Sequence, residues 1–272
     1  MKDGRKVGFI GAGNMASALA KGMLAAGLIA AEQLFAADVD EERRRSFERG
    51  TSATVLSANR DVVDQCDVVV LAVKPQQMQA VLEEAGPEFA ERHLVISIAA
   101  GITTAYIEKF LRNGVRLVRA MPNTPMLVGA GAVGISKGKW ATDVDIALAR
   151  SLFEAAAVVV NVEEEQLDAV TAVSGSGPAY FFYLAEMMIE AGVELGLSEE
   201  TATALARQTA RGAGKMLAER DEHPRRLREM VTSPGGTTQA AIEAMDRAEV
   251  RESVIAAIKA AAARSVELGK QV

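Results

Sequence analysis

Apolar and polar positions follow two distinct patterns along the chain. Through residue 162, short apolar runs rich in β-branched residues end in glycine or polar residues, which is typical of strands buried in a parallel sheet. These runs predict strands at residues 6–10, 33–37, 67–73, 94–99, 115–120, 131–136 and 157–162. The stretches between them predict helices at residues 14–26 and 40–49, ended by Gly27 and Gly50, at 103–111 and 143–156, and from Pro75 onward. Strands that alternate with helices predict βαβ units with right-handed crossovers.

The pattern changes after Glu163, where long stretches rich in alanine, leucine and methionine replace the strand-like runs. They predict helices at residues 179–195, 198–218, 238–247 and 250–269, with no strong strand after residue 162. The predicted fold class is therefore α/β, with a doubly wound N-terminal domain at residues 1–162 and an all-helical C-terminal domain at residues 163–272. Roughly 110 residues with mostly small side chains make a thin core, so we expect the helical domain to complete its core with a second subunit.

Composition narrows the function classes. Apolar residues make up 49% of the 272 residues and charged residues 24%, which suffices for a sizeable core. The net charge of −6 argues against nucleic-acid binding, and the lack of a long uninterrupted apolar run argues against a membrane span. The single cysteine, Cys66, excludes an internal disulfide, and with only His93 and His223 beside it a zinc site is not expected. We expect no metal and a reducing, cytoplasmic location.

The first predicted strand runs into a glycine turn. Gly8 lies within the strand, and residues 11–16, Gly-Ala-Gly-Asn-Met-Ala, fit the pattern G-x-G-x-x-A. Gly11 permits the tight turn, Gly13 lets a pyrophosphate approach the backbone, and the free N–H groups at the start of the next helix face the phosphates. This pattern between a strand and a helix predicts dinucleotide binding; the alternative is a purely structural turn.

The end of the second predicted strand bears on the choice between NADH and NADPH. Asp38 there would accept hydrogen bonds from the ribose hydroxyls of NAD and repel a 2′-phosphate. One of Arg43, Arg44 and Arg45 could instead pair with that phosphate. Asp38 or Asp40 could also simply cap the following helix. The sequence leaves these readings open.

Other candidate cofactor residues follow later strands, because ligands of doubly wound sheets lie beyond the carboxyl ends of the strands. Ala72, Lys74 and Pro75 end the clearest strand, although Lys74 could be an ordinary surface lysine. Ala100 and Asn123 follow two further strands, and the small residues around Ala100 suit a flat nicotinamide ring.

Two glycine-rich segments interrupt the helical half, at residues 173–180 and 231–238. Each runs directly into a predicted helix, so exposed N–H groups, hydroxyls and a positive helix end come together and could hold a carboxylate. The alternative is a plain connection between helices. No catalytic triad can be assembled, which fits a hydride transfer, since that step needs positioning and charge more than a strong base.

The motifs VGFIGAGNMASALAKG, LAVKPQ, MPNTP, AVSGSGPAY and VTSPGGTT together resemble the pyrroline-5-carboxylate reductase family, in order and over nearly the whole chain. The resemblance implies reduction of the cyclic imine 1-pyrroline-5-carboxylate to L-proline with NADPH or NADH, the last step of proline biosynthesis. It also implies a Rossmann domain, a helical domain that forms an interlocked dimer, and in several members a decameric ring of dimers.

The resemblance also implies roles for individual residues. Thr238 resembles the threonine whose hydroxyl meets the imine nitrogen, and Ser233, Gly236 and Thr237 the loop that holds the substrate carboxylate. Gly175 and Ser176 resemble a facing loop, and Glu164 an acidic residue near the proline site. The matching cofactor positions are Gly11, Asn14, Met15, Asn59, Lys74 and Ala100. Asp38 stands where serine or arginine is often found in NADPH-preferring members, so the choice of cofactor stays open.

Two other functions remain as alternatives. One is a different Rossmann-plus-helical enzyme, such as a 3-hydroxyacid dehydrogenase or an imine reductase, for which Lys215 is the candidate lysine. The other is a non-catalytic dinucleotide sensor, which would keep Gly11 and Gly13 without needing the second glycine-rich cluster.

Overall fold

The chain forms two compact units in a computed structural model that describes residues 4–270. The first unit runs to Ser176 and takes in the chain again from Ala261, and the second comprises Gly177–Ala260. The predicted domain boundary at residue 162 follows the last strand, whereas the compact units divide after Ser176 and after Ala260.

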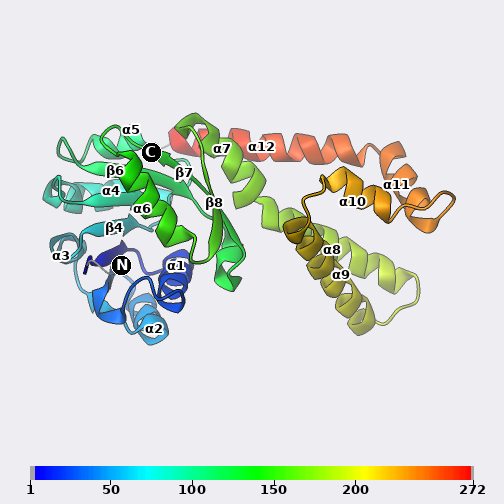
Figure 1. Cartoon of the computed structure of the whole chain (residues 1–272), viewed down its shortest axis with the longest axis horizontal. Helices are drawn as coiled ribbons and strands as arrows, with labels where there is room; N and C mark the ends of the chain where they lie inside the picture. The colour runs from blue at the N-terminus through cyan, green and yellow to red at the C-terminus, as the bar shows by residue number, and fades with distance from the viewer. Residues whose placement is uncertain (1–3, 271–272) are drawn as a thin grey trace. The chain divides into compact units, whose positions relative to one another are not determined.

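The first unit is built on an 8-stranded sheet with the order β3-β2-β1-β4-β5-β6-β7-β8 (Figure 1). Neighbouring strands are parallel except β6 and β7, which are antiparallel. The strands are β1 (Val7–Ile10), β2 (Leu34–Ala37), β3 (Thr54–Leu56), β4 (Val68–Leu71), β5 (Leu94–Ser97), β6 (Arg116–Met121), β7 (Gly131–Lys137) and β8 (Ala157–Asn161). The order runs outward from β1 in both directions, so the carboxyl ends of β1 and β4 flank the topological switch point, where such sheets bind ligands.

Helices cover both faces of this sheet, which explains why its central strands are apolar along their whole length. Alternate residues of a strand point to opposite faces. Phe9 and Val70 accordingly join a core with α1 (Asn14–Ala25), α2 (Glu41–Thr51) and α6 (Asp143–Phe153). Ile10 and Val69 join a second core with α3 (Asn59–Gln65), α4 (Pro75–Ala85) and α5 (Thr104–Glu108). Short 3-10 turns lie at Ala31–Gln33, Gly86–Glu88, Thr124–Val128 and Glu164–Gln166.

The rest of the chain is helical. α7 (Leu167–Val170) continues through a π-helical turn at Thr171–Gly175, in which the Ser176 N–H donates to the Thr171 carbonyl over 2.8 Å. The second unit holds α8 (Gly177–Glu194), α9 (Glu199–Glu219), α10 (Pro224–Met230), α11 (Thr237–Arg247) and the first half of α12 (Val250–Lys270). None of the helices in residues 4–270 is long and apolar enough to cross a membrane.

The predicted fold class, an N-terminal Rossmann-like sheet followed by an all-helical region, is confirmed. Several local predictions were wrong. The helix expected to stop at Gly50 includes that glycine and ends one residue later, at Thr51, because Phe47 and Thr51 are both buried and Ser52 takes the left-handed φ of 56°. The short elements β3, α3 and α10 were missed, since each carries too few apolar positions to show a period.

Residues 173–180 also differ from expectation, because they form helix where a helix-breaking segment was predicted. Pro178 lacks an N–H and cannot bond to the carbonyl four residues earlier, that of Ser174. The amide of Asn123 donates to that carbonyl over 3.0 Å. The chain can therefore stay helical through a glycine- and proline-rich stretch.

Candidate active site

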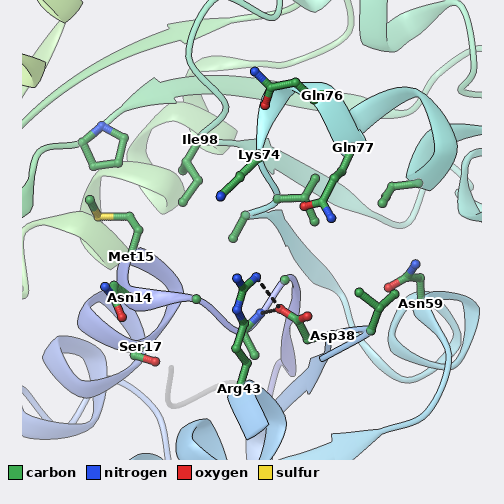
Figure 2. Close-up of a pocket in the computed structure, with 18 of the residues that line it drawn as sticks. Asn14, Met15, Ser17, Asp38, Arg43, Asn59, Lys74, Gln76, Gln77 and Ile98 are labelled. Carbon is green, nitrogen blue, oxygen red and sulfur yellow. Dashed lines mark hydrogen bonds and ion pairs between the residues drawn. The ribbon is translucent and has the colours of Figure 1, made fainter. Parts of the chain in front are cut away.

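A pocket of about 900 Å³ lies at the carboxyl ends of the central strands. Its lining comes entirely from the first unit. Most of the predicted cofactor residues line it, namely Gly11, Gly13, Asn14, Met15, Asp38, Asn59, Ala72, Lys74 and Asn123, together with Gly175. Figure 2 shows side chains from several separate segments facing the same space, with Asp38 and Arg43 on one side and Lys74 and Gln77 on the facing side.

The glycine turn at one wall of this pocket suits a pyrophosphate. Gly11 has φ +98°, and a Cβ there would lie 2.7 Å from the Ala72 carbonyl oxygen, so only glycine fits. Gly13 is the N-cap of α1 and offers no side-chain hydrogen bond, while the first helical bond, from the Ser17 N–H to the Gly13 carbonyl, spans 2.9 Å. The N–H groups of Asn14 and Met15 are thereby left for a ligand. A Cβ at Gly13 would meet nothing within 4 Å, so the backbone there is open to the pocket.

Asp38 is tied into this turn. Its Oδ2 accepts the Ala12 N–H over 2.8 Å, and its Oδ1 accepts the Asp40 N–H over 2.9 Å. The cap of α2 is Asp40, whose carboxylate accepts the N–H groups of Glu42 and Arg43. Asp38 therefore links the end of β2 to the glycine turn and does not cap the helix.

Two further polar side chains reach the pocket from the starts of helices. Lys74 is the N-cap residue of α4 and lies three residues after Leu71, the last residue of β4. Asn59 begins α3, and its Nδ2 donates to Glu84 Oε2 over 2.8 Å. Both residues therefore combine a place in the pocket lining with a helix start, where backbone N–H groups are also unpaired.

The opposite wall of the pocket includes the buried side-chain amide of Asn123. Asn123 Oδ1 accepts the Ala132 N–H over 2.8 Å, and its Nδ2 donates to Ser174. These bonds join the segment after β6, the start of β7 and the π-helical turn. Gly175 in that turn lies against Met121, because a Cβ on it would be 2.7 Å from the Met121 Cε. The missing side chain lets the turn form part of the pocket wall.

Some predicted residues lie elsewhere. Pro75 and Ala100 are adjacent to lining segments but are not among the lining residues, and neither is Ser176. Gly8 faces the protein interior, where a Cβ would collide with Val62 and approach Cys66 Sγ to 2.7 Å. Its role in the structure is therefore close packing of β1 on α3.

Glu164 also lies outside the pocket lining. Its carboxylate accepts the Thr104 N–H over 2.6 Å and the Thr104 hydroxyl over 2.5 Å, and it pairs with Arg119 Nη1 over 3.1 Å. Arg119 is itself buried in β6. Glu164 thereby connects the start of α5, at Thr104, to β6, which contains Arg119.

The second predicted cluster, Ser233, Gly236, Thr237 and Thr238, belongs to the second unit. Gly236 is the N-cap of α11 and Thr237 its first residue, so Thr238 lies in the first turn. The Gly236 N–H donates to the Ser233 carbonyl over 3.0 Å and closes the loop. Among the described residues the Thr238 hydroxyl has no hydrogen-bond partner. The loop therefore offers a free hydroxyl beside unpaired N–H groups.

Two buried titratable side chains, those of Cys66 and His93, lie outside the pocket lining. Burial raises the pKa of the Cys66 thiol to about 12, so the thiol stays protonated. Burial also lowers the pKa of His93, whose Nε2 lies 3.1 Å from the Val63 carbonyl oxygen. No cluster of three or more potential metal ligands of the His, Cys, Asp or Glu type occurs in residues 4–270.

Sequence reasoning missed several lining residues. Among them are Ser17, Ser46, Gln76, Gln77, Ala80, Glu84 and Ile98. Met121, Pro122 and Thr124, which share the MPNTP motif with Asn123, line the pocket as well. Ser46 stands three residues after Arg43, a spacing that puts both on one face of α2.

Comparisons with known proteins agree with this geometry. Residues 164–268 match the family described as pyrroline-5-carboxylate reductase dimerisation, and residues 6–101 match the family described as NADP oxidoreductase coenzyme F420-dependent. The pyrroline-5-carboxylate reductase of Methanosarcina acetivorans is 41% identical over 99% of this chain and 100% of its own length. That of Pseudomonas aeruginosa is 43% identical over 98% of this chain and 97% of its own.

Solved structures give the same result. A pyrroline-5-carboxylate reductase from Coxiella burnetii has a TM-score of 0.89 at 40% identity, covering 97% of this chain and 98% of that chain. The Plasmodium falciparum pyrroline carboxylate reductase, solved with NADP bound, has a TM-score of 0.87 at 32% identity with the same coverage.

The fold and the pocket therefore define an NAD(P)H-dependent oxidoreductase with a Rossmann-like sheet. Within that class, the chain belongs to the pyrroline-5-carboxylate reductase family. The residues present fit a dinucleotide, because the glycine turn, the uncapped start of α1 and the long pocket meet at one place.

Replacing Gly13 by valine tests the glycine turn. The new side chain would enter the open space over the turn, so Gly13→Val should fold normally and lose NAD(P)H affinity by more than about tenfold. Calorimetric titration with NADPH and NADH, beside a thermal melt, measures both quantities.

Gly8→Ala is the matched control within the same motif. Its Cβ would meet Val62 and Cys66 in the core, so it should cost about 1–3 kcal/mol of stability while the folded protein still binds cofactor. Parent-like NAD(P)H binding by folded Gly13→Val would refute the role of this glycine.

Proposed function

We propose that this protein reduces 1-pyrroline-5-carboxylate to L-proline with NAD(P)H, the last step of proline biosynthesis. The observation that carries the proposal is identity of about two residues in five with reductases of that name over nearly the full length of both chains. The dinucleotide pocket and the free hydroxyl at the start of α11 supply the two chemical requirements, a place for a hydride donor and a group to orient the imine.

The first unit is proposed to hold the cofactor, which when bound supplies the hydride. The N–H groups after Gly13 would take the pyrophosphate, and Lys74 would add positive charge at the end of β4. Asn123 would shape the far wall by holding the π-helical turn in place. Ala100 and Pro75 stay proposed as neighbours of the cofactor, next to the lining residues Ile98 and Lys74.

The second unit is proposed to hold the substrate. The Ser233, Gly236 and Thr237 loop, with the unpaired N–H groups of α11, would bind the carboxylate, and Thr238 would donate its hydroxyl to the imine nitrogen. Gly175, the last residue of the π-helical turn, and Ser176, which follows it, belong to the first unit and are proposed to contact the substrate. Glu164 is proposed to act indirectly, since its oxygens already hold Thr104 and Arg119.

The division of roles follows the predicted domains, with residues 1–162 for the dinucleotide and residues 163–272 for substrate and self-association. A cytoplasmic location is also proposed. It is supported by the single cysteine, Cys66, which is free and so forms no disulfide. Fractionation of cells that express the full-length protein tests the location directly.

Purified protein should oxidise NADPH or NADH only when 1-pyrroline-5-carboxylate is present, with proline as the product. Absorbance at the nicotinamide band gives the rate, and amino-acid analysis identifies the product. A folded protein that makes no proline with either cofactor would contradict the proposed reaction and favour a dinucleotide sensor.

Thr238→Ala should lower kcat while leaving the Kd for NAD(P)H unchanged. Loss of one aligned hydrogen bond in a closed site costs roughly 5- to 150-fold in rate. Because Gly236 is the helix cap, the melting temperature should hardly change. Thr238→Ser keeps the hydroxyl and should recover most of the rate. An unchanged kcat/KM for Thr238→Ala would exclude the role of this hydroxyl.

The second unit should pair with another copy of itself. Its family is described as a dimerisation domain, and α8 leaves Phe181, Phe182 and Tyr183 between 62% and 64% exposed in the single chain. Three exposed aromatic side chains so close together favour a buried interface. We propose a dimer, with assembly of dimers into a decamer as the finer possibility.

Sedimentation at micromolar concentration should show a dimer or a larger species and no monomer. Phe182→Asp should shift the protein toward monomer, because it places a charge in the proposed interface. Val144→Asp, at a position 74% exposed in the first unit, is the matched control and should leave the assembly unchanged. A parent protein that sediments as a monomer would contradict the proposal.

A further inference from the structure

Arg43, Arg44 and Arg45 are consecutive in the sequence and have different surroundings in the structure. The sequence alone offers no reason to choose one of them as the partner of a 2′-phosphate. All three lie in the first turns of α2, which begins at Glu41 and follows the end of β2. Arg43 lines the cofactor pocket, and its side chain is 46% exposed. The guanidinium of Arg44 donates to the Asp38 carbonyl, and that of Arg45 pairs with Glu41 over 2.5 Å, so neither lines the pocket. Only Arg43 among the three presents its charge to the cofactor.

Arg43 rests beside two carboxylates in a loose arrangement. Its Nη1 lies 4.0 Å from Asp38 Oδ2, and its Nε lies 3.5 Å from Asp40 Oδ2. Both distances are longer than a good hydrogen bond. In Figure 2 the guanidinium lies beside the Asp38 carboxylate and faces the pocket. The side chain is therefore held by charge while its N–H donors remain available to a ligand.

Asp38 differs from Arg43 because it is fixed. The backbone N–H groups of Ala12 and Asp40 hold its two oxygens, and its side chain is only 7% exposed. It cannot turn away from a bound ribose without releasing the glycine turn. A negative charge thus stays at the ribose end of the pocket whichever cofactor binds, and Arg43 is the nearest side chain that can offset it.

A hydroxyl completes this end of the pocket. Ser46 also lines it and stands one helical turn after Arg43 on the same face of α2. A guanidinium and a hydroxyl on one helix face are donors that suit the three oxygens of a phosphate monoester.

We propose that Arg43 is the residue that lets this protein accept the 2′-phosphate of NADPH despite Asp38. With NADPH bound, the guanidinium leaves the carboxylates of Asp38 and Asp40 and pairs with the 2′-phosphate, with Ser46 as a second donor. With NADH bound, it stays beside Asp38, whose remaining lone pairs accept the ribose hydroxyls. Arg43 is thus a specificity-determining residue, and the inference rests on the proposed function only in taking NAD(P)H as the cofactor.

Ligand binding without turnover tests this proposal. Full-length protein is titrated calorimetrically with NADPH and NADH, and with the fragments adenosine 2′,5′-bisphosphate and adenosine 5′-monophosphate, in the absence of 1-pyrroline-5-carboxylate. Arg43→Ala should weaken the affinity for NADPH and for the bisphosphate by roughly 10- to 100-fold. That is the loss expected when one charge-assisted, hydrogen-bonded pair is removed. Affinity for NADH and the monophosphate should change less than about threefold.

Two variants serve as controls. Arg45→Ala removes a neighbouring charge that does not line the pocket, and it should leave the ratio of NADPH to NADH affinity within about twofold. Arg43→Lys keeps a charge but loses the planar fork, and it should recover part of the NADPH affinity. Affinity of the parent for NADPH should also fall with added salt more steeply than that of Arg43→Ala.

The proposal is overturned if Arg43→Ala weakens NADPH and NADH equally, or if it changes neither. It is also overturned if Arg45→Ala matches the effect of Arg43→Ala, since a general loss of positive charge would then explain both. Circular dichroism and a thermal melt establish that each variant is folded, and Arg43→Gln supplies a second neutral variant. Because no imine is present, these results stand apart from any failure of proline formation.

Discussion

The turn between β1 and α1 is held by hydrogen bonds to both neighbouring strands, and the cofactor half depends on it. The Gly11 N–H donates to the Ala37 carbonyl at the end of β2, and the Ala72 N–H donates to the Ile10 carbonyl, each over 2.8 Å. The close approach of Gly11 to Ala72 leaves no room for a side chain. Three strand ends are thus locked together at the switch point of the sheet, with the uncapped start of α1 facing the pocket.

That constraint places a negative charge where a dinucleotide must bind. Asp38 completes the turn by accepting the Ala12 N–H, so its carboxylate stabilises the same backbone that would receive the pyrophosphate. The ribose end of the pocket therefore carries a fixed anion and a movable cation, Arg43, side by side. Cofactor preference in this chain follows from the balance between these two side chains, because neither the glycine turn nor Lys74 distinguishes a ribose hydroxyl from a ribose phosphate.

The helical half meets a different constraint. Its side chains are small, and within the single chain few of them are buried, while aromatic residues of α8 face outward. Such a unit gains little from its own core, so a partner copy is the natural source of the missing apolar contacts. The same unit carries the Thr238 loop. The proposed substrate loop and the proposed dimer interface therefore belong to one unit.

The sequence by itself determined the class of fold, since continuous apolar runs such as residues 67–73 require a sheet covered on both faces, and the glycine motif requires a tight turn. Most of the predicted cofactor residues also line the pocket, because strand ends converge at one edge of a parallel sheet. The sequence did not determine helix ends such as Ser52, the helical path of residues 173–180, or which of three arginines faces the cofactor. Those depend on tertiary packing: the burial of Thr51, the hydrogen bond from the Asn123 amide to the Ser174 carbonyl, and the packing of Phe47, which orients α2 against the core. Local patterns report periodicity and composition, whereas only tertiary packing decides which of several chemically equivalent side chains points into the site.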